Sequence, residues 1–240
     1  MQLLSQTIKP DYEEFLRVIR REGTPRRVHH IELFHDGEVA AAIRERYDIG
    51  RKLSQDDPYY HQKLDIEFKR FLGFDWVWGG PEGFWPGFNL TRAEDTAGDM
   101  GHKDGRSWMA ERGGPIQTWE DFEKYPWDEF FKLGTKNLEW LSKNLPDDMM
   151  IMGSGMGQFC EYLCWYFGYE SLCYALCEQR DLVLAMKEKI EKLFMMRLEL
   201  MLQFDRVKAV FGADDLGFKT GLLLGTRETR ELILPGHKMV

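Results

Sequence analysis

The chain has 240 residues, 43% of them hydrophobic and 30% charged, a composition that indicates a globular protein with a sizeable core. Its formal net charge of −8 argues against a nucleic-acid-binding surface and favours a cytoplasmic protein that handles a small molecule. The sequence does not open with a basic segment and an apolar run, and no apolar run approaches the roughly 20 residues that span a bilayer. We therefore expect neither a signal peptide nor a membrane segment.

The first third of the chain predicts helices that alternate with two strands. Phe15, Leu16 and Ile19 recur with helical spacing, and the segment RVHHIELF has the character of a strand. The predicted elements are a helix at 11–22, a strand at 27–34, helices at 38–47 and 58–72, and a strand at 73–78.

The middle of the chain is rich in glycine and turn-forming residues from 83 to 117. Its pattern predicts a hairpin that turns near Lys103–Gly105. Thr118 and Asp121 have the spacing of a capping box and predict a short helix. A longer helix is expected at 127–144.

The last third repeats a strand–loop–helix order. A strand at 148–153 precedes a glycine-rich loop and a helix at 158–167, and a long core helix is expected at 182–204. A further strand at 207–211 leads into an acidic loop, after which Thr226 is the expected N-cap of a helix that approaches Pro235.

Two adjacent carboxylates, Asp214 and Asp215, follow the strand at 207–211. In parallel α/β folds, the loops after the carboxyl ends of the strands hold most catalytic residues. The same residues could instead cap the N-terminus of a neighbouring helix, and the sequence leaves both interpretations open.

The histidines and cysteines give weaker signals. Among six histidines, His35 is the best placed, because it stands at the carboxyl end of a predicted strand. Cys160, Cys164, Cys173 and Cys177 form two pairs four residues apart on predicted helices. A metal site is conceivable there, but we favour buried apolar positions without disulfides.

The segment GADDLGFKTGLLLGTRETRELILPGHKMV resembles the uroporphyrinogen decarboxylase superfamily, and the likeness spans most of residues 20–240. That superfamily contains the decarboxylases of haem synthesis and zinc-dependent corrinoid methyltransferases. The resemblance implies a single α/β domain over residues 1–240 with the fold of a TIM (β/α)8 barrel. A barrel needs eight strands, whereas four are predicted here. We therefore expect a barrel that is incomplete at its C-terminal end and a chain that self-associates through an open sheet edge.

The resemblance also implies site residues. Glu82 falls near an essential aspartate of the decarboxylases. Where the family has an acid or a tyrosine in the helix at 158–167, this sequence has Glu161 and Tyr162, and a gapless match places the decarboxylase tyrosine on Cys164. The resulting candidates are, for catalysis, Asp214, Asp215, Glu82 and Tyr162, and, for substrate binding, His35, Glu161 and Lys219.

Two reactions follow from the resemblance. A methyltransferase-like member would move a methyl group between a corrinoid, held by a corrinoid protein, and a thiol or other small acceptor, with zinc lowering the pKa of the thiol. Its zinc ligands cannot be assigned in this sequence. A decarboxylase-like member would need no cofactor, because a carboxylate such as Asp214 would stabilise a protonated pyrrole. A third possibility is an inactive paralogue or subunit.

One departure from the decarboxylases bears on the substrate. Their first strand leads into a segment whose arginines hold substrate carboxylates, and the matching residues here are Phe34–Glu38, which contain no arginine. A porphyrinogen with eight carboxylates would meet an acidic side chain where it needs guanidinium groups.

We therefore predict that the purified chain does not decarboxylate uroporphyrinogen. The expected result is coproporphyrinogen no higher than in an enzyme-free control, measured by chromatography of the oxidised porphyrins. Coproporphyrinogen above that control would contradict the prediction.

Overall fold

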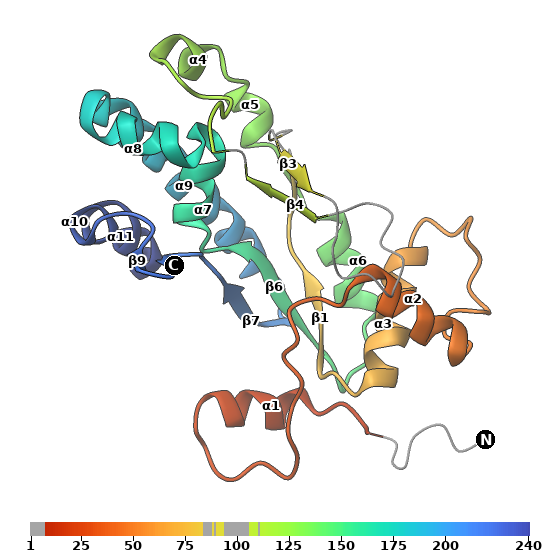
Figure 1. The fold of residues 1–240 in the computed structure, drawn as a ribbon. Coiled ribbons are helices and arrows are strands. Elements are labelled where there is room, and N and C mark those ends of the chain that lie inside the picture. The colour runs from red at the N-terminus through yellow and green to blue at the C-terminus, as the bar shows by residue number, and fades with distance from the viewer. Residues whose placement is uncertain (1–7, 84–87, 89, 94–105, 110) are drawn as a thin grey trace. The chain divides into compact units, whose positions relative to one another are not determined.

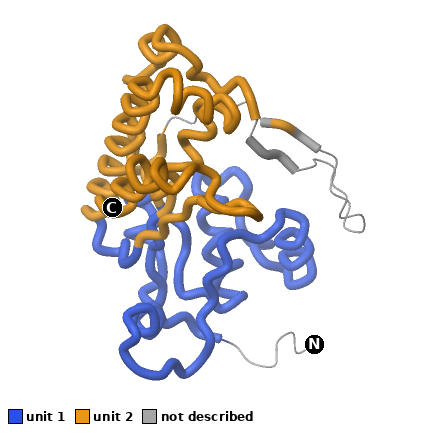
Figure 2. Tube along the Cα trace, turned by 60° about the vertical axis from the view of Figure 1, so that its left-hand side comes forward, with its two compact units in different colours: residues 1–79, 137–153, 204–209 blue, residues 80–136, 154–203, 210–240 orange. Residues whose placement is uncertain are grey.

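A computed structural model describes residues 8–83, 88, 90–93, 106–109 and 111–240 (Figure 1). The chain divides into two compact units, which Figure 2 shows in different colours. Unit 1 comprises residues 1–79, 137–153 and 204–209, and unit 2 comprises residues 80–136, 154–203 and 210–240. Two of the boundaries between the units fall within strands. Each unit is described by itself below.

Unit 1 is built on a three-stranded sheet with strand order β1-β6-β7 (Figure 1). The strands are β1 (Trp76–Gly79), β6 (Met150–Met156) and β7 (Val207–Gly212). β1 and β6 are parallel, in a register that runs from Trp76 opposite Met150 to Gly79 opposite Gly153. On the other side of β6, the Ile151 N–H donates to the Arg206 carbonyl at 2.8 Å. The predicted α/β class is confirmed; the described strands do not establish a barrel.

The sheet is held by side chains that leave solvent almost completely. Trp76, Met150, Ile151 and Met152 are each 1% exposed or less. Such a continuous apolar run is typical of a parallel strand that is covered on both faces. The helices of unit 1 are α1 (Tyr12–Ile19), α2 (Gly37–Arg46), α3 (Tyr60–Leu72) and α6 (Lys136–Asn144).

One glycine shows how closely α6 approaches the sheet. A Cβ atom at Gly79 would lie 2.6 Å from Ile151 Cγ2 and 3.1 Å from Leu141 Cδ1. Leu138 and Leu141 of α6 are buried. The absence of a side chain at position 79 therefore permits the close packing of α6 on β1 and β6.

The predicted strand at 27–34 is wrong. These residues form no strand, and Val28 and Phe34 are 85% and 75% exposed. The segment is attached instead by two indole N–H groups: Trp76 Nε1 donates to the His30 carbonyl at 3.1 Å and Trp78 Nε1 to the Leu33 carbonyl at 3.0 Å. These two indole N–H groups take the place of a neighbouring strand as hydrogen-bond donors. The alternating sequence pattern of residues 27–34 therefore occurs in a segment that belongs to no sheet.

Unit 2 consists of helices and short two-stranded pairings. Its strands are β2 (Glu82–Gly83), β3 (Leu90–Ala93), β4 (Arg106–Met109), β5 (Leu133–Gly134), β8 (Gly217–Phe218) and β9 (Gly221–Leu222). Its helices are α4 (Trp119–Lys124), α5 (Trp127–Phe130), α7 (Phe159–Phe167), α8 (Tyr169–Glu178), α9 (Arg180–Met201), α10 (Thr226–Glu228), the π-helical turn η1 (Thr229–Ile233) and α11 (Leu234–Met239).

Several predictions about unit 2 can be compared with these elements. β3 and β4 form the expected antiparallel pair, whereas the predicted turn at Lys103–Gly105 lies outside the described residues. The single helix predicted at 127–144 is wrong, because β5 interrupts it and pairs with β2. Within the described part of the chain, no helix combines the length and the apolar character that a membrane span needs.

The C-terminal helical segment does not stop at Pro235. Proline occupies one of the first two positions of α11, directly after the π-helical turn η1. The prediction for the cysteines is half right. Cys160 and Cys164 are buried in α7, but Cys173 and Cys177 are exposed on α8.

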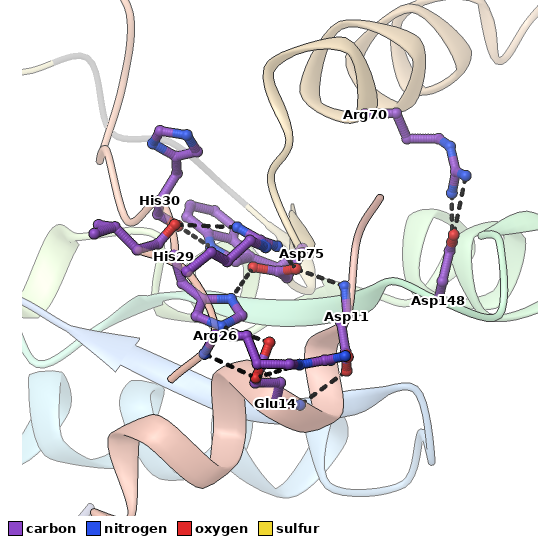
Figure 3. A network of polar contacts seen from close by, with 11 residues as sticks. Asp11, Glu14, Arg26, His29, His30, Arg70, Asp75 and Asp148 are labelled. Carbon is purple, nitrogen blue, oxygen red and sulfur yellow. Dashed lines mark hydrogen bonds and ion pairs between the residues drawn. The ribbon is translucent and has the colours of Figure 1, made fainter. Parts of the chain in front are cut away.

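A network of charges fastens the N-terminal segment of unit 1 to the start of β1 (Figure 3). Asp75 is fully buried and accepts hydrogen bonds from the Asp11 N–H at 2.6 Å and from the Arg27 guanidinium. His29 Nδ1 lies 2.7 Å from Asp75 Oδ2, and its Nε2 lies 3.5 Å from Glu14 Oε2. The buried carboxylate is thus compensated by three donors.

Glu14 also belongs to this network, and its surroundings lower its pKa. Its side chain is 6% exposed, and Arg26 Nε donates to it at 2.8 Å. That hydrogen bond is the main reason that the pKa of Glu14 falls from 4.5 to about 2. A lowered pKa means that the folded state favours the ionised carboxyl. Its stabilising contribution is therefore complete above pH 4.5 and is lost as the pH falls towards about 2.

We predict that Glu14→Gln flattens the acid limb of the stability curve. The free energy of unfolding, measured by urea denaturation between pH 5 and 2, should fall less steeply for this variant, because the titrating carboxyl is gone. Glu13→Gln is the matched control, since Glu13 is exposed on the same helix. Equal slopes for Glu14→Gln and the unsubstituted chain would contradict the prediction.

Candidate active site

The carboxylate of Asp214 is held at the N-terminus of α7. The backbone N–H of Cys160 donates to Asp214 Oδ2 at 2.9 Å, and the N–H of Glu161 donates to Oδ1 at 3.0 Å. The side chain of Asp214 is only 2% exposed. A helix N-terminus offers unpaired N–H groups and the positive end of the helix dipole, so α7 is a suitable anchor for this buried acid.

His237 completes a pair with Asp214. His237 Nε2 lies 2.9 Å from Asp214 Oδ2, and the imidazole side chain is 31% exposed. The buried carboxylate therefore orients a histidine that solvent or a ligand can still reach. A carboxylate in this position fixes the orientation of the imidazole ring, as in enzymes where an acid orients a catalytic histidine.

The position of His237 depends on the residue before it. Gly236 is buried, and a Cβ atom there would lie 2.6 Å from Phe159 Cε1. The His237 ring packs edge-on against Phe159, with the ring centroids 5.0 Å apart. Because glycine lets α11 approach the first residue of α7, His237 reaches the carboxylate that the same helix holds.

Burial changes the ionisation of two acids in this region. Burial raises the pKa of Asp214, although the N–H groups of Cys160 and Glu161 and the His237 side chain partly oppose it. The pKa of Glu161 is also raised, first by burial and then by the negative charges of Asp214 and Asp215. Neighbouring acids with raised pKa values can hold protons that ordinary surface carboxyls release.

Tyr162 follows Glu161 on α7 but belongs to an aromatic cluster. It is 8% exposed, and its ring stacks on Trp165 with centroids 5.6 Å apart and lies edge-on to Phe194 at 5.1 Å. Burial raises the pKa of its phenol, and the positive charge of Arg197 offsets part of this rise. The predicted catalytic tyrosine is thus a neutral phenol beside a buried cation.

Arg197 is a candidate binding residue that sequence reasoning missed. Among the described residues, its Nε atom is buried without a hydrogen-bond partner, and burial lowers the pKa of the guanidinium. A Cβ atom at Gly155 would lie 2.6 Å from Arg197 Nη2, and one at Gly80 would lie 3.6 Å from it. A guanidinium with an unsatisfied donor, set against glycine backbone, is suited to a carboxylate of a ligand.

A signal for Arg197 and for His237 was present in the sequence. Arg197 lies three and four residues after Phe194 and Leu193, on the apolar stripe of a helix that was predicted to be core. A charge on such a stripe indicates a buried ion. His237 lies inside the segment that carries the family resemblance, but a lone histidine is more often structural, and it was not chosen as a candidate.

The remaining candidates are placed as follows. Asp215 is exposed, next to Asp214. Lys219 is exposed in the turn between β8 and β9, and Glu82 is exposed in β2, paired opposite Gly134. His35 belongs to unit 1, whereas the other six candidates belong to unit 2. The structure therefore groups Asp214, Asp215, Glu161 and Tyr162 around the start of α7.

The cysteines of α7 do not form a thiolate site. The pKa of Cys164 is raised, first by its hydrogen bond with Cys160 and then by burial. Zinc binds the thiolate form, which this environment disfavours. Among the residues that the structure describes, no group of three or more His, Cys, Asp or Glu side chains could hold a metal ion. This donor set does not fit the zinc that the methyltransferase branch uses.

No protein-family model, curated protein or solved structure matches this chain.

We predict different stability losses for the two adjacent aspartates. Asp214→Ala leaves the N–H groups of Cys160 and Glu161 without their acceptor and should lower the free energy of unfolding by about 1–3 kcal/mol. Asp215→Ala should change it by less than about 0.5 kcal/mol, because Asp215 is exposed. Urea denaturation of the two variants tests this, and equal losses would show that Asp214 does not anchor α7.

Proposed function

We propose that the chain is an enzyme of the uroporphyrinogen decarboxylase superfamily that acts on a small substrate bearing carboxylates by acid–base chemistry. The observation that carries this proposal is the pairing of buried Asp214 with half-exposed His237, 2.9 Å apart. The order of strand, acidic loop and helix at residues 207–240 agrees with a barrel strand followed by its catalytic loop. On this proposal, β1, β6 and β7 are strands of a TIM barrel.

His237 is the acid–base group in this proposal, and Asp214 is its positioning residue. The carboxylate accepts from Nε2, which fixes the orientation of the ring. The exposed imidazole can exchange its proton with solvent between turnovers. Glu161, whose pKa is raised, supplies a second proton-bearing group beside it.

Arg197 is the substrate-binding residue in this proposal. It holds one carboxylate of the substrate through its guanidinium, whose buried Nε has no acceptor among the described residues. Of the two reactions that the resemblance implies, decarboxylation matches this set of residues better. A proton from His237 adds to a ring carbon, the bond from that carbon to a second carboxylate breaks, and carbon dioxide leaves with the electron pair returned to the ring.

Methyl transfer would need zinc, and the described side chains do not supply a fitting donor set. We therefore derive no step through zinc or a corrinoid. The absence of arginines at Phe34–Glu38 also favours a substrate with fewer carboxylates than a porphyrinogen.

The test uses pyrrole-2,4-dicarboxylate as the probe, with the purified full chain in D2O. We expect release of carbon dioxide and deuterium at the vacated ring carbon, both measured by NMR. Arg197→Gln should raise KM about tenfold or more, the usual effect of losing a charge-assisted hydrogen bond. Arg230→Gln is the matched control, because Arg230 is an exposed arginine of the same unit.

The two members of the pair should differ in their effect on kcat. His237→Gln should lower kcat about 100-fold or more, the usual contribution of a general acid. Asp214→Asn should lower kcat less and leave KM unchanged, because in this proposal Asp214 orients the histidine and does not contact the substrate. Carbon dioxide no higher than in the absence of the chain, or an unchanged kcat in His237→Gln, would overturn the proposal; the first outcome would favour an inactive paralogue or subunit.

A further inference from the structure

Unit 1 contains a cavity between α2 and α3, two helices that lie next to each other in Figure 1. It has a volume of about 360 Å³, and its walls come from residues 32–35, from α2, from α3 and from Trp78. This volume is within the range of about 300–1,000 Å³ that small-molecule sites occupy. We call it the α2–α3 cavity. Nothing in the acid–base chemistry proposed for unit 2 uses it.

The floor of the cavity holds a buried amine. The Lys69 side chain is 7% exposed, and its ammonium lies 4.6 Å from the ring centroid of Trp76 and 5.6 Å from that of Trp78. Lys69 Nζ is 3.4 Å from Asp65 Oδ2 but makes no hydrogen bond to any described residue. Burial lowers the pKa of this amine. A buried ammonium whose one carboxylate partner lies at ion-pair distance, outside hydrogen-bond geometry, keeps N–H donors that a bound anion would satisfy.

A second cation lines the wall. Arg44 of α2 faces the cavity, and its guanidinium lies 6.0 Å from the ring centroid of Phe68. Among the described residues, Arg44 makes no ion pair with a carboxylate. It also lines a neighbouring hollow of about 570 Å³ between α2 and α3. A guanidinium that is stacked on a ring and has no carboxylate partner is well suited to a planar anionic group.

The other ionisable groups of the cavity are two acids and two histidines. Asp65 is the ion-pair partner of Lys69, and Glu32 is exposed, so solvent screens its charge. His35 packs edge-on against Phe68 with ring centroids 5.4 Å apart, and His61 completes the set. The two cations therefore face one exposed, screened acid and one acid that is already paired.

The remaining wall is aromatic, since Phe34, Phe68 and Trp78 all line the cavity. Apolar rings with a few polar groups are the usual composition of a small-molecule site, in which the rings supply contact area and the polar groups fix orientation. We propose that the α2–α3 cavity binds a small aromatic carboxylate, with its ring against Phe68 and Trp78 and its carboxylate on Arg44 and Lys69.

The probe for this site is 2-naphthoate, compared with uncharged 2-naphthamide, by isothermal titration calorimetry on the full chain. We expect one molecule of 2-naphthoate to bind, at least about tenfold more tightly than 2-naphthamide, because only the carboxylate forms charge-assisted hydrogen bonds. Arg44→Gln should remove that preference. Arg46→Gln should not, because Arg46 is an exposed arginine of the same helix that does not line the cavity.

Three further variants keep the test independent of any one substitution. Lys69→Met conserves the apolar stem and should weaken 2-naphthoate binding, whereas Glu32→Gln should leave it equal or tighter. Arg197→Gln should leave it unchanged, which separates this site from the one proposed in unit 2. Circular dichroism confirms that each variant is folded.

Equal binding of the two probes would overturn the proposal. So would equal weakening by Arg44→Gln and Arg46→Gln, loss of binding in Arg197→Gln, or no binding of 2-naphthoate up to its solubility limit.

Discussion

The central position of β6 is the constraint on which unit 1 depends. A central parallel strand must pair its backbone on both sides, and β6 does so with β1 and β7. Its residues Met150, Ile151 and Met152 are almost fully buried, so a polar substitution in this stretch would place an unpaired group in the core. The order β1-β6-β7 brings together segments that are more than 50 residues apart in the sequence. Hydrogen bonding to β6 therefore fixes where β1 and β7 end and where the loops after them start.

Two buried aspartates illustrate how the surroundings of a carboxylate decide its use. Asp75 is fully buried and accepts from Arg27 and a backbone N–H, and His29 lies at hydrogen-bond distance, so its partners lie inside unit 1. The Asp214 side chain is nearly as buried, and its partners in the described part of the chain are two backbone N–H groups and His237. The first arrangement ties the N-terminal segment to the start of a strand, whereas the second connects a buried carboxylate to a histidine that solvent can reach.

The sequence predicted much of the local structure and less of the candidate site. Apolar runs located β1, β6 and β7, and the capping box of Thr118 and Asp121 is present as expected. Residues 27–34 were misjudged because alternation reveals a preference for extended backbone but not whether a partner strand exists. Asp214 was found because it follows a strand. His237 and Arg197 were not chosen as candidates. Their surroundings depend on how α11 and α9 pack against other elements, and a local sequence pattern does not determine such packing.

The glycines around Arg197 have a consequence for how this sequence can change. A Cβ atom at Gly155 would come within 2.6 Å of the guanidinium, and Gly80 and Gly83 have Arg197 nitrogens within 3.7 Å of the same position. Gly155 is distant in sequence from Gly80 and Gly83, yet all three border the same guanidinium. Each is also confined by something other than the arginine: Gly155 has a φ of +76°, and a Cβ atom would lie 3.0 Å from the Ser154 carbonyl oxygen at Gly80 and 2.9 Å from Leu133 at Gly83. In diverging copies of this gene, the three glycines should therefore persist even where a shorter residue replaces the arginine.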